Sequence, residues 1–168
     1  MINPPKASFA EIIIHEKHGL SQVEYNDKNM KTREFISQSS GETQQIAENL
    51  ASDLKPGACL VLIGNLGAGK TTFVQGLARG LGVSDSVVSP TFTLLREYAG
   101  RVPLYHVDAY RIKHIDELRE IGLEDYMMAE GIVAIEWGEK ATGLLPKNCI
   151  TVSFELLPDH TRKIHIEQ

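Results

Sequence analysis

The segment 64–72 of the chain contains the residues with the clearest chemical pattern. It reads GNLGAGKTT and matches G-x-x-x-x-G-K-[ST] without a gap. Glycines at this spacing let successive backbone N–H groups point inward and form a nest for an anion. The lysine adds a mobile positive charge, and a threonine hydroxyl is a hard oxygen ligand suited to Mg²⁺. The pattern therefore predicts a loop that binds the phosphates of a nucleotide together with magnesium.

The surroundings of this loop favour binding over the alternative, an ordinary glycine turn with a fortuitous lysine. The short apolar run Cys59–Ile63 precedes it and predicts a buried strand. Phe73, Leu77 and Leu81 follow at a spacing of four, which predicts a helix ending at Gly82. We expect nucleotide contacts from consecutive residues of the loop, namely Asn65, Leu66, Gly67, Ala68, Gly69, Lys70, Thr71 and Thr72.

Two carboxylates follow apolar runs elsewhere in the chain. Asp108 ends Leu104–Val107, and Glu136 ends Ile132–Ile135. A carboxylate beside a buried strand is costly without a cation, and nucleotide hydrolysis needs a carboxylate near the metal. We therefore expect Lys70, Asp108 and Glu136 to act in catalysis, and Thr71, Asp108 and Glu136 to hold magnesium. The alternative for either acid is a capping or surface carboxylate.

Three further features leave alternatives open. Trp137, the single tryptophan, follows Glu136 and either contacts the nucleotide or fills the core. The segment Ser89-Pro90-Thr91 either senses a terminal phosphate or forms a turn with a capping hydroxyl. Arg111 either neutralises charge in a transition state or pairs with an acid.

The remaining pattern alternates helices and strands early and is rich in strands late. Ser39 stands three residues before Glu42, a capping-box pattern that starts a helix, and Pro56-Gly57 ends it. Other expected elements are listed by range: strands Thr32–Ser37, Thr91–Tyr98 and Leu104–Val107, a helix Asp116–Met128 broken near Gly122, and a hairpin of Ile150–Leu156 with Lys163–Ile166. We predict an α/β fold, a single P-loop NTPase-like domain with a mixed parallel/antiparallel sheet flanked by helices.

Length and composition fit one soluble globular domain. The chain has 168 residues, is 42% hydrophobic and carries a formal net charge of -5. We expect residues 1–31 to be a loosely ordered N-terminal extension, with one short strand near Phe9–Ile14, and residues 32–168 to be the ATPase domain. No apolar stretch approaches the length of a membrane span, and Cys59 and Cys149 form no disulfide framework. We expect a cytoplasmic protein without a membrane partner.

Four motifs, taken together, resemble the bacterial TsaE family, once called YjeE. The resemblance covers about residues 37–157. The motifs are Gly64–Thr72, Ser89–Thr93, Tyr105–Arg111 and Ile135–Trp137. One departure is Asn65, which stands where the family commonly has aspartate. Asparagine keeps the hydrogen-bonding oxygen and loses the charge, so we expect little effect on phosphate binding.

The resemblance implies a function and a set of site residues. The family is the ATPase component that forms threonylcarbamoyladenosine at position 37 of tRNAs reading codons that begin with A. It implies ATP and Mg²⁺ as cofactors, the TsaB and TsaD proteins as partners, and tRNA as an indirect partner through that complex. Lys70 and Thr71 match the Walker A residues, Asp108 an essential aspartate, and Glu136 a magnesium-linked glutamate. By the same resemblance, Trp137 lies beside the nucleotide and Thr43 near its adenine side.

Two other functions compete with an ATPase that acts on a protein complex. A small-molecule or nucleoside kinase would need an arginine-rich lid, yet the acidic segment after Arg111 holds only Arg119. A nucleotide-gated adaptor with negligible turnover would carry the same loop.

We predict that the isolated chain binds tRNA weakly at physiological salt. Its net charge is -5 and it has no run of five or more Lys or Arg residues, whereas proteins that bind tRNA tightly use a basic surface. An anisotropy titration with labelled tRNA measures this affinity. Tight binding by the chain alone would contradict the prediction.

Overall fold

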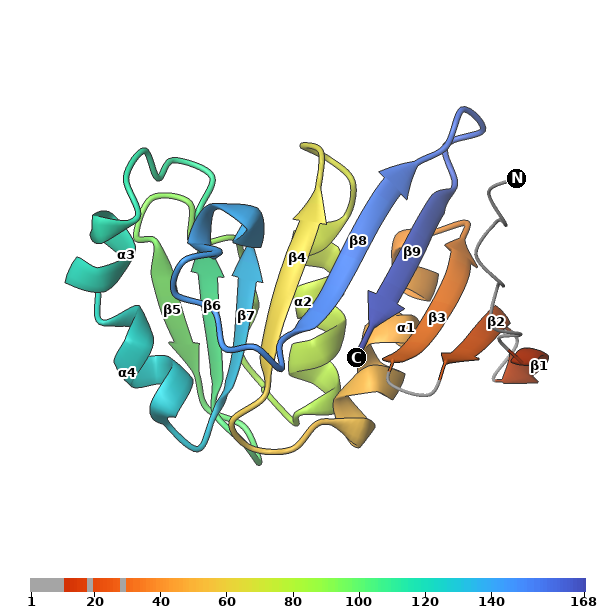
Figure 1. Cartoon of the computed structure of the whole chain (residues 1–168), viewed down its shortest axis with the longest axis horizontal. Coiled ribbons are helices and arrows are strands. Elements are labelled where there is room, and N and C mark those ends of the chain that lie inside the picture. The colour runs from red at the N-terminus through yellow and green to blue at the C-terminus, as the bar shows by residue number, and fades with distance from the viewer. Residues whose placement is uncertain (1–10, 18–19, 28–29) are drawn as a thin grey trace, which may run out of the picture.

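The computed structural model describes residues 11–17, 20–27 and 30–168 of the chain. Within these residues, nine strands form one sheet that has helices on both faces (Figure 1). The strands are β1 Glu11–Lys17, β2 Leu20–Asp27, β3 Met30–Ser37, β4 Cys59–Gly64, β5 Leu95–Tyr98, β6 Leu104–Asp108, β7 Ile132–Glu136, β8 Ile150–Leu156 and β9 Arg162–Glu167. The helices are α1 Ser40–Asp53, α2 Lys70–Gly80, α3 Asp116–Glu120 and α4 Leu123–Met128, with the 3₁₀ helix η1 at Gly138–Ala141.

The sheet is parallel in its centre and antiparallel at both sides. Its strand order is β1-β2-β3-β9-β8-β4-β7-β6-β5. Strand β4 pairs in parallel with β7 and β8, and β6 pairs in parallel with β7. Strands β1, β2, β3 and β9 extend the sheet antiparallel from β8, and β5 pairs antiparallel with β6. The mixed α/β sheet predicted from the sequence is confirmed.

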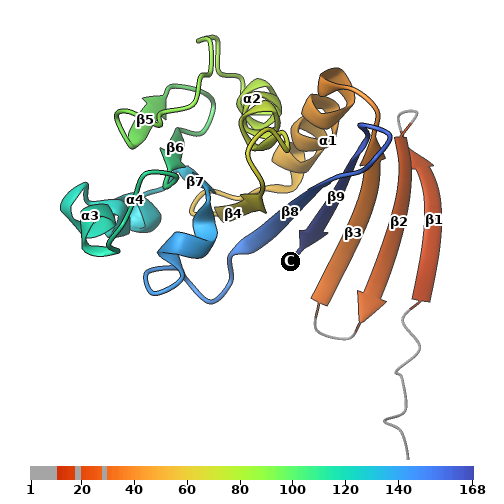
Figure 2. The ribbon, with the colours of Figure 1, turned by 90° about the horizontal axis from the view of Figure 1, so that it is seen from above.

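Strand β4 is buried on both faces, as its apolar run predicted. Leu60 and Leu62 belong to the core beneath α1 and α2, whereas Cys59 and Val61 belong to the core on the other face. The alternation follows because successive side chains of a strand point to opposite sides. Figure 2 shows α1 and α2 on one side of the sheet and α3 and α4 on the other.

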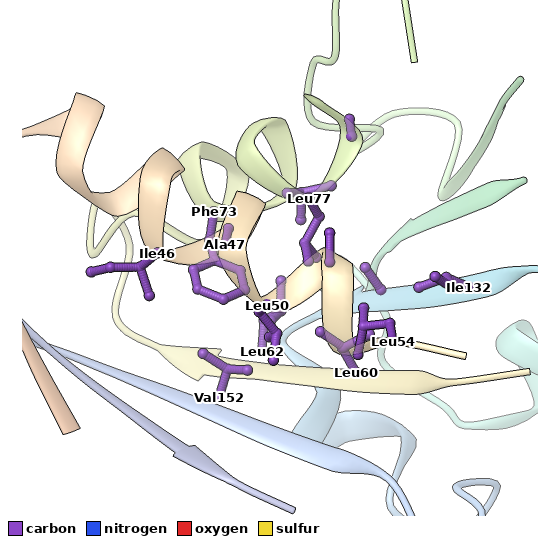
Figure 3. Close-up of a cluster of buried hydrophobic side chains, with 14 of the residues drawn as sticks. Ile46, Ala47, Leu50, Leu54, Leu60, Leu62, Phe73, Leu77, Ile132 and Val152 are labelled. Carbon is purple, nitrogen blue, oxygen red and sulfur yellow. The ribbon is translucent and has the colours of Figure 1, made fainter. Parts of the chain in front are cut away.

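Helices α1 and α2 cover the sheet through one apolar cluster. Ile46 and Leu50 of α1 and its C-cap residue Leu54, at a spacing of four, meet Phe73 and Leu77 of α2 in this cluster above β4, as Figure 3 shows. The predicted cap is present, because the hydroxyl of Ser39 accepts a hydrogen bond from the backbone N–H of Glu42 at 3.2 Å. These contacts fix the start of α2, and with it the end of the glycine-rich loop, against the sheet.

The end of α2 and the break between α3 and α4 also follow the sequence pattern. Gly82, after α2, adopts a left-handed conformation with φ +74°. Gly122, between the two short helices, does the same with φ +73°. The C-terminal hairpin β8–β9 is confirmed as well. In the part of the chain that the structure describes, no helix is long and apolar enough to span a membrane.

The N-terminal region differs from the loosely ordered extension expected for residues 1–31. Residues 11–17 and 20–27 form β1 and β2, and the expected boundary after residue 31 falls inside β3. Residues 1–10 lie outside the described residues. The short strand expected near Phe9–Ile14 overlaps β1. Strand β2 was not expected, because the apolar residues of its sequence, LSQVEYND, are interspersed with polar ones.

The strand expected over Thr91–Tyr98 is wrong in its first half. The backbone N–H groups of Thr93 and Leu94 both donate to the carbonyl of Pro90, at 3.0 Å and 2.6 Å, which closes a turn. Leu94 then has φ +63°, and β5 begins only at Leu95. The β-branched residues Thr91 and Thr93 therefore lie in a loop and not in the sheet.

We predict that Gly76→Ala lowers the free energy of unfolding by about 1–3 kcal/mol, the usual cost of overpacking. A Cβ at Gly76 would lie 2.2 Å from the carbonyl oxygen and 2.7 Å from the Cα of Gln44, so α1 and α2 would have to separate. Denaturant unfolding measures the change. Gly41→Ala is the control, because its Cβ would meet only Ser39 Oγ at 3.8 Å. Equal stability of the two variants would show that the helices have room to move.

Candidate nucleotide site

The glycine-rich loop joins the end of β4 to the start of α2. Gly67 has φ +78° and Gly69 has φ +106°, a region of backbone conformation that favours glycine. Helix α2 begins at Lys70, directly after Gly69. The loop thus lies at the N-terminus of a helix packed on a parallel strand, which is an arrangement that binds phosphate through backbone N–H groups and the helix dipole.

A cavity of about 330 Å³ lies beside this loop. It is lined by residues from five separate parts of the chain, namely Leu66, Gly67, Gly69, Lys70, Thr71, Thr72, Ser89, Thr91, Asp108, Tyr110, Glu136, Trp137 and Arg162. The parallel pairing of β6, β7 and β4 explains this assembly, since their carboxyl ends meet at one edge of the sheet.

Lys70 is almost fully buried and folds back onto the loop. Its Nζ donates hydrogen bonds to the carbonyl oxygens of Gly64 and Asn65, the second at 2.9 Å. The same Nζ lies 3.9 Å from the centre of the Trp137 ring, within range of a cation–π interaction. Burial lowers the pKa of the Lys70 ammonium from its ordinary value, against an opposing effect of nearby acids, first Glu136.

Glu136 joins the loop to the core of the sheet. Thr71 Oγ1 donates a hydrogen bond to Glu136 Oε1 at 2.7 Å, and His106 Nε2 lies 2.9 Å from the same oxygen. Glu136 is only 4% exposed. The threonine and glutamate expected to share a magnesium ion are therefore direct neighbours, although 65 residues separate them in the sequence.

Asp108 is held by hydrogen bonds from two directions. Its Oδ2 accepts from the hydroxyl of Ser89 at 2.6 Å and also from the hydroxyl of Thr91. Its Oδ1 accepts from the backbone N–H of Tyr110 at 2.9 Å. The Ser89–Thr91 segment, which leads into the turn closed by the carbonyl of Pro90, thus directs two hydroxyls at the second carboxylate of the cavity.

Trp137 lines the cavity next to Lys70. Its backbone has φ +58°, an uncommon value for a bulky residue, and it directly precedes η1. Its ring packs on that of Tyr110, with centroids 5.0 Å apart. Lys140 of η1 holds this pair in place, because its Nζ donates to the carbonyl of Tyr110 and, at 3.1 Å, to that of Ile112.

The residues expected at the site do not all line the cavity. Asn65 and Ala68 belong to the loop but do not line the cavity. The backbone carbonyl of Asn65 accepts a hydrogen bond from Lys70, and Ala68 is 1% exposed. Thr43 is fully buried, and its hydroxyl lies 2.8 Å from that of Ser37. It approaches the site only indirectly, since a Cβ on Gly69 would lie 3.9 Å from its methyl group.

Several residues of the site were absent from the set expected from the sequence. Ser89 and Thr91 belong to the segment whose role was left open, and Tyr110 lies in a motif where it was given no role of its own. His106 lies two residues before Asp108. Arg162 comes from the start of β9, and a Cβ on Gly69 would lie 3.4 Å from its Cδ and Nε. No local pattern marks Arg162, because only the pairing of β9 with β8 brings it to the loop.

The donor atoms of the cavity suit magnesium bound together with a phosphate ligand. A threonine hydroxyl and two carboxylates are hard oxygen donors. Among the described residues, no group of three or more His, Cys, Asp or Glu side chains forms a metal cage. Mg²⁺ commonly binds one or two carboxylates and completes its shell with water and substrate phosphates, so this limited donor set fits it.

Comparison with known proteins identifies the family of this chain. A family model described as "Threonylcarbamoyl adenosine biosynthesis protein TsaE" matches residues 37–164, the greater part of the chain. The chain belongs to the TsaE family. The match includes the loop, both carboxylates, Trp137 and Arg162. The match begins at residue 37, at the end of β3, so β1 and β2 lie outside the range that the family model matches.

Individual relatives cover nearly the same region. The TsaE protein of Treponema pallidum is 40% identical over 78% of this chain and 97% of its own length. That of Aquifex aeolicus is 41% identical over 80% of this chain and 95% of its own length. The crystal structure of Bacillus subtilis YdiB is 34% identical, with a TM-score of 0.72 over 84% of this chain and 88% of YdiB.

We predict that Lys140→Met in this TsaE family member increases quenching of Trp137 fluorescence by acrylamide. Methionine keeps the length of the side chain but cannot donate to the carbonyls of Tyr110 and Ile112, so the aromatic pair loosens. Trp137 is the single tryptophan, which makes the signal specific. Lys147→Met, at an exposed position, is the control. Unchanged quenching in both variants would contradict a clamping role for Lys140.

Proposed function

We propose that this TsaE family member binds ATP with Mg²⁺ and hydrolyses it to drive formation of threonylcarbamoyladenosine at position 37 of tRNA. The observation that supports this most directly is the cavity itself. It brings Lys70 and Thr71 of the loop together with Asp108 and Glu136 from the ends of two parallel strands. Binding of phosphates and activation of water need these two sets of groups in one place.

The charged and hydroxyl side chains around the loop have roles that their positions support. Lys70 would exchange the carbonyls of Gly64 and Asn65 for phosphate oxygens, while the N–H groups of the loop hold the phosphates. Thr71 and Glu136 would hold magnesium, which neutralises charge on the phosphates when bound. Arg162 adds a second positive charge to the cavity wall.

Asp108 is best suited to link hydrolysis to the Ser89–Thr91 turn. Both hydroxyls of this turn donate to its Oδ2, so movement of the turn would change the orientation of the carboxylate. From this position Asp108 would orient the attacking water or bind magnesium through water. Movement of this turn by another protein would therefore change the rate of hydrolysis.

Exposed apolar side chains near the cavity support such dependence on partners. Leu66 of the loop is 74% exposed, and Phe92, next to Thr91, is 82% exposed. The guanidinium of Arg111 stacks on the Phe92 ring at 4.0 Å. Large exposed apolar groups beside a site commonly mark a protein interface. We propose TsaB and TsaD as the partners, with tRNA reached through them in the cytoplasm.

The kinase and adaptor alternatives remain outcomes of the test. Arg119, the arginine that follows Arg111, forms a surface pair with Asp116 and does not line the cavity. That position argues against a cationic lid over an acceptor substrate. An adaptor would share the cavity but would show no turnover even with partners.

We predict that Lys70→Ala and Asp108→Ala each reduce ATP hydrolysis at least about a hundredfold, the scale for loss of one transition-state contact. Phosphate release by the purified chain, alone and with TsaB, TsaD and tRNA, measures the effect. Circular dichroism checks that the fold survives. Asp85→Ala is the control, because Asp85 is exposed and does not line this cavity.

The outcomes separate the candidate functions. Stimulated hydrolysis in the presence of the partners supports the proposed ATPase. Transfer of phosphate to a nucleoside would instead identify a kinase, and binding without turnover would identify an adaptor. Native-like hydrolysis by Asp108→Ala would remove the catalytic role of that residue.

A further inference from the structure

His106 is a buried polar residue in contact with the proposed magnesium site. It lies on β6, is fully buried, and its Nε2 is 2.9 Å from Glu136 Oε1. The register of β6 and β7 places His106 opposite Ala134 and Asp108 opposite Glu136. The imidazole therefore reaches diagonally past the small side chain of Ala134 to the carboxylate.

The chemistry of this pair fixes the direction of the hydrogen bond. An ionised carboxylate only accepts, so Nε2 of His106 carries the hydrogen and donates it to Glu136. The other nitrogen, Nδ1, is buried and has no hydrogen-bond partner among the described residues. Burying an unpaired polar atom costs free energy. The position of the ring therefore leaves one of its two nitrogens unsatisfied. Its single hydrogen bond goes to Glu136.

The two donors to Glu136 act on the same oxygen. Thr71 Oγ1 and His106 Nε2 both contact Oε1, whereas Oε2 takes part in no hydrogen bond within the described chain. Thr71 lines the cavity, but His106 does not and is shielded from it. A ligand in the cavity can rearrange Thr71 more easily than His106, so the histidine is the more permanent of the two constraints.

We infer that His106 is a positioning residue that holds Oε1 of Glu136 and so leaves Oε2 available to magnesium or its bound water. The inference rests on the proposed binding of a magnesium–nucleotide complex. Outer-sphere partners of metal ligands commonly contribute about 10–100-fold to metal affinity. His106 should therefore affect the binding of magnesium and leave binding of the nucleotide without metal nearly unchanged.

A series of substitutions distinguishes a hydrogen-bonding role of His106 from a role in core packing alone. Glutamine can place an amide N–H near the position of Nε2, whereas asparagine places one near Nδ1, and leucine offers none. His106→Gln should retain magnesium binding, while His106→Asn and His106→Leu should lose it. If the ring only fills the core, the three variants will instead follow their volumes and stabilities.

The experiment titrates magnesium into the full chain with a fluorescent ADP analogue, and repeats the nucleotide titration in EDTA. For His106→Leu we expect the magnesium concentration at half-saturation to rise at least about tenfold, with the affinity in EDTA changed less than about twofold. His114→Gln, at an exposed histidine, is the control. Thermal unfolding identifies folded variants, and if His106→Leu does not fold, the comparison of His106→Gln with His106→Asn decides.

Native-like magnesium binding by His106→Asn or His106→Leu would overturn the inference, as would equal loss in His106→Gln and His106→Asn. A native chain that binds the nucleotide in EDTA but gains nothing from magnesium would overturn the positioning role as well. A native chain that binds no nucleotide under either condition would refute the proposed function itself. The two failures are therefore distinguishable.

Discussion

The parallel pairing of β6, β7 and β4 is the constraint on which the site depends. Its register places Asp108 beside Glu136, and Glu136 beside Leu62 near the end of β4. A shift of one residue would turn Glu136 to the opposite face of the sheet, away from Thr71. The buried side chains of these strands resist such a shift, since alternate residues fill two different cores. Packing in the sheet therefore sets the distance between the carboxylates and the loop.

Strong local signals made most of this fold predictable from the sequence. The loop pattern, the apolar runs of β4, β6 and β7, and the spacing of Leu50 and Leu54 on α1 each depend on neighbours within a few residues. Lys70, Thr71, Asp108 and Glu136 line one cavity, and each could be selected from the sequence because strand ends and a loop pattern are visible locally. The prediction needed only the rule that parallel strands align their carboxyl ends.

The features that escaped prediction depend on pairing over long distances. Arg162 reaches the cavity through the pairing of β9 with β8, and nothing in its neighbours indicates that position. Strand β2 pairs with β1 and β3 although its sequence, LSQVEYND, has only a weak apolar pattern, so its place depends on its neighbours in the sheet. Thr91 illustrates the opposite error, because its β-branched neighbourhood favours a strand while the carbonyl of Pro90 closes a turn.

The position of Arg162 on the last strand has a consequence for how the site comes into existence. Residues of the cavity run from Leu66 to Arg162, so its wall is complete only after the C-terminal hairpin has joined the sheet. A chain still being synthesised lacks this cation until β9 has been made. The cavity wall is thus complete only when β9 has paired with β8. A ligand that contacts the whole wall would stabilise this pairing together with the loop.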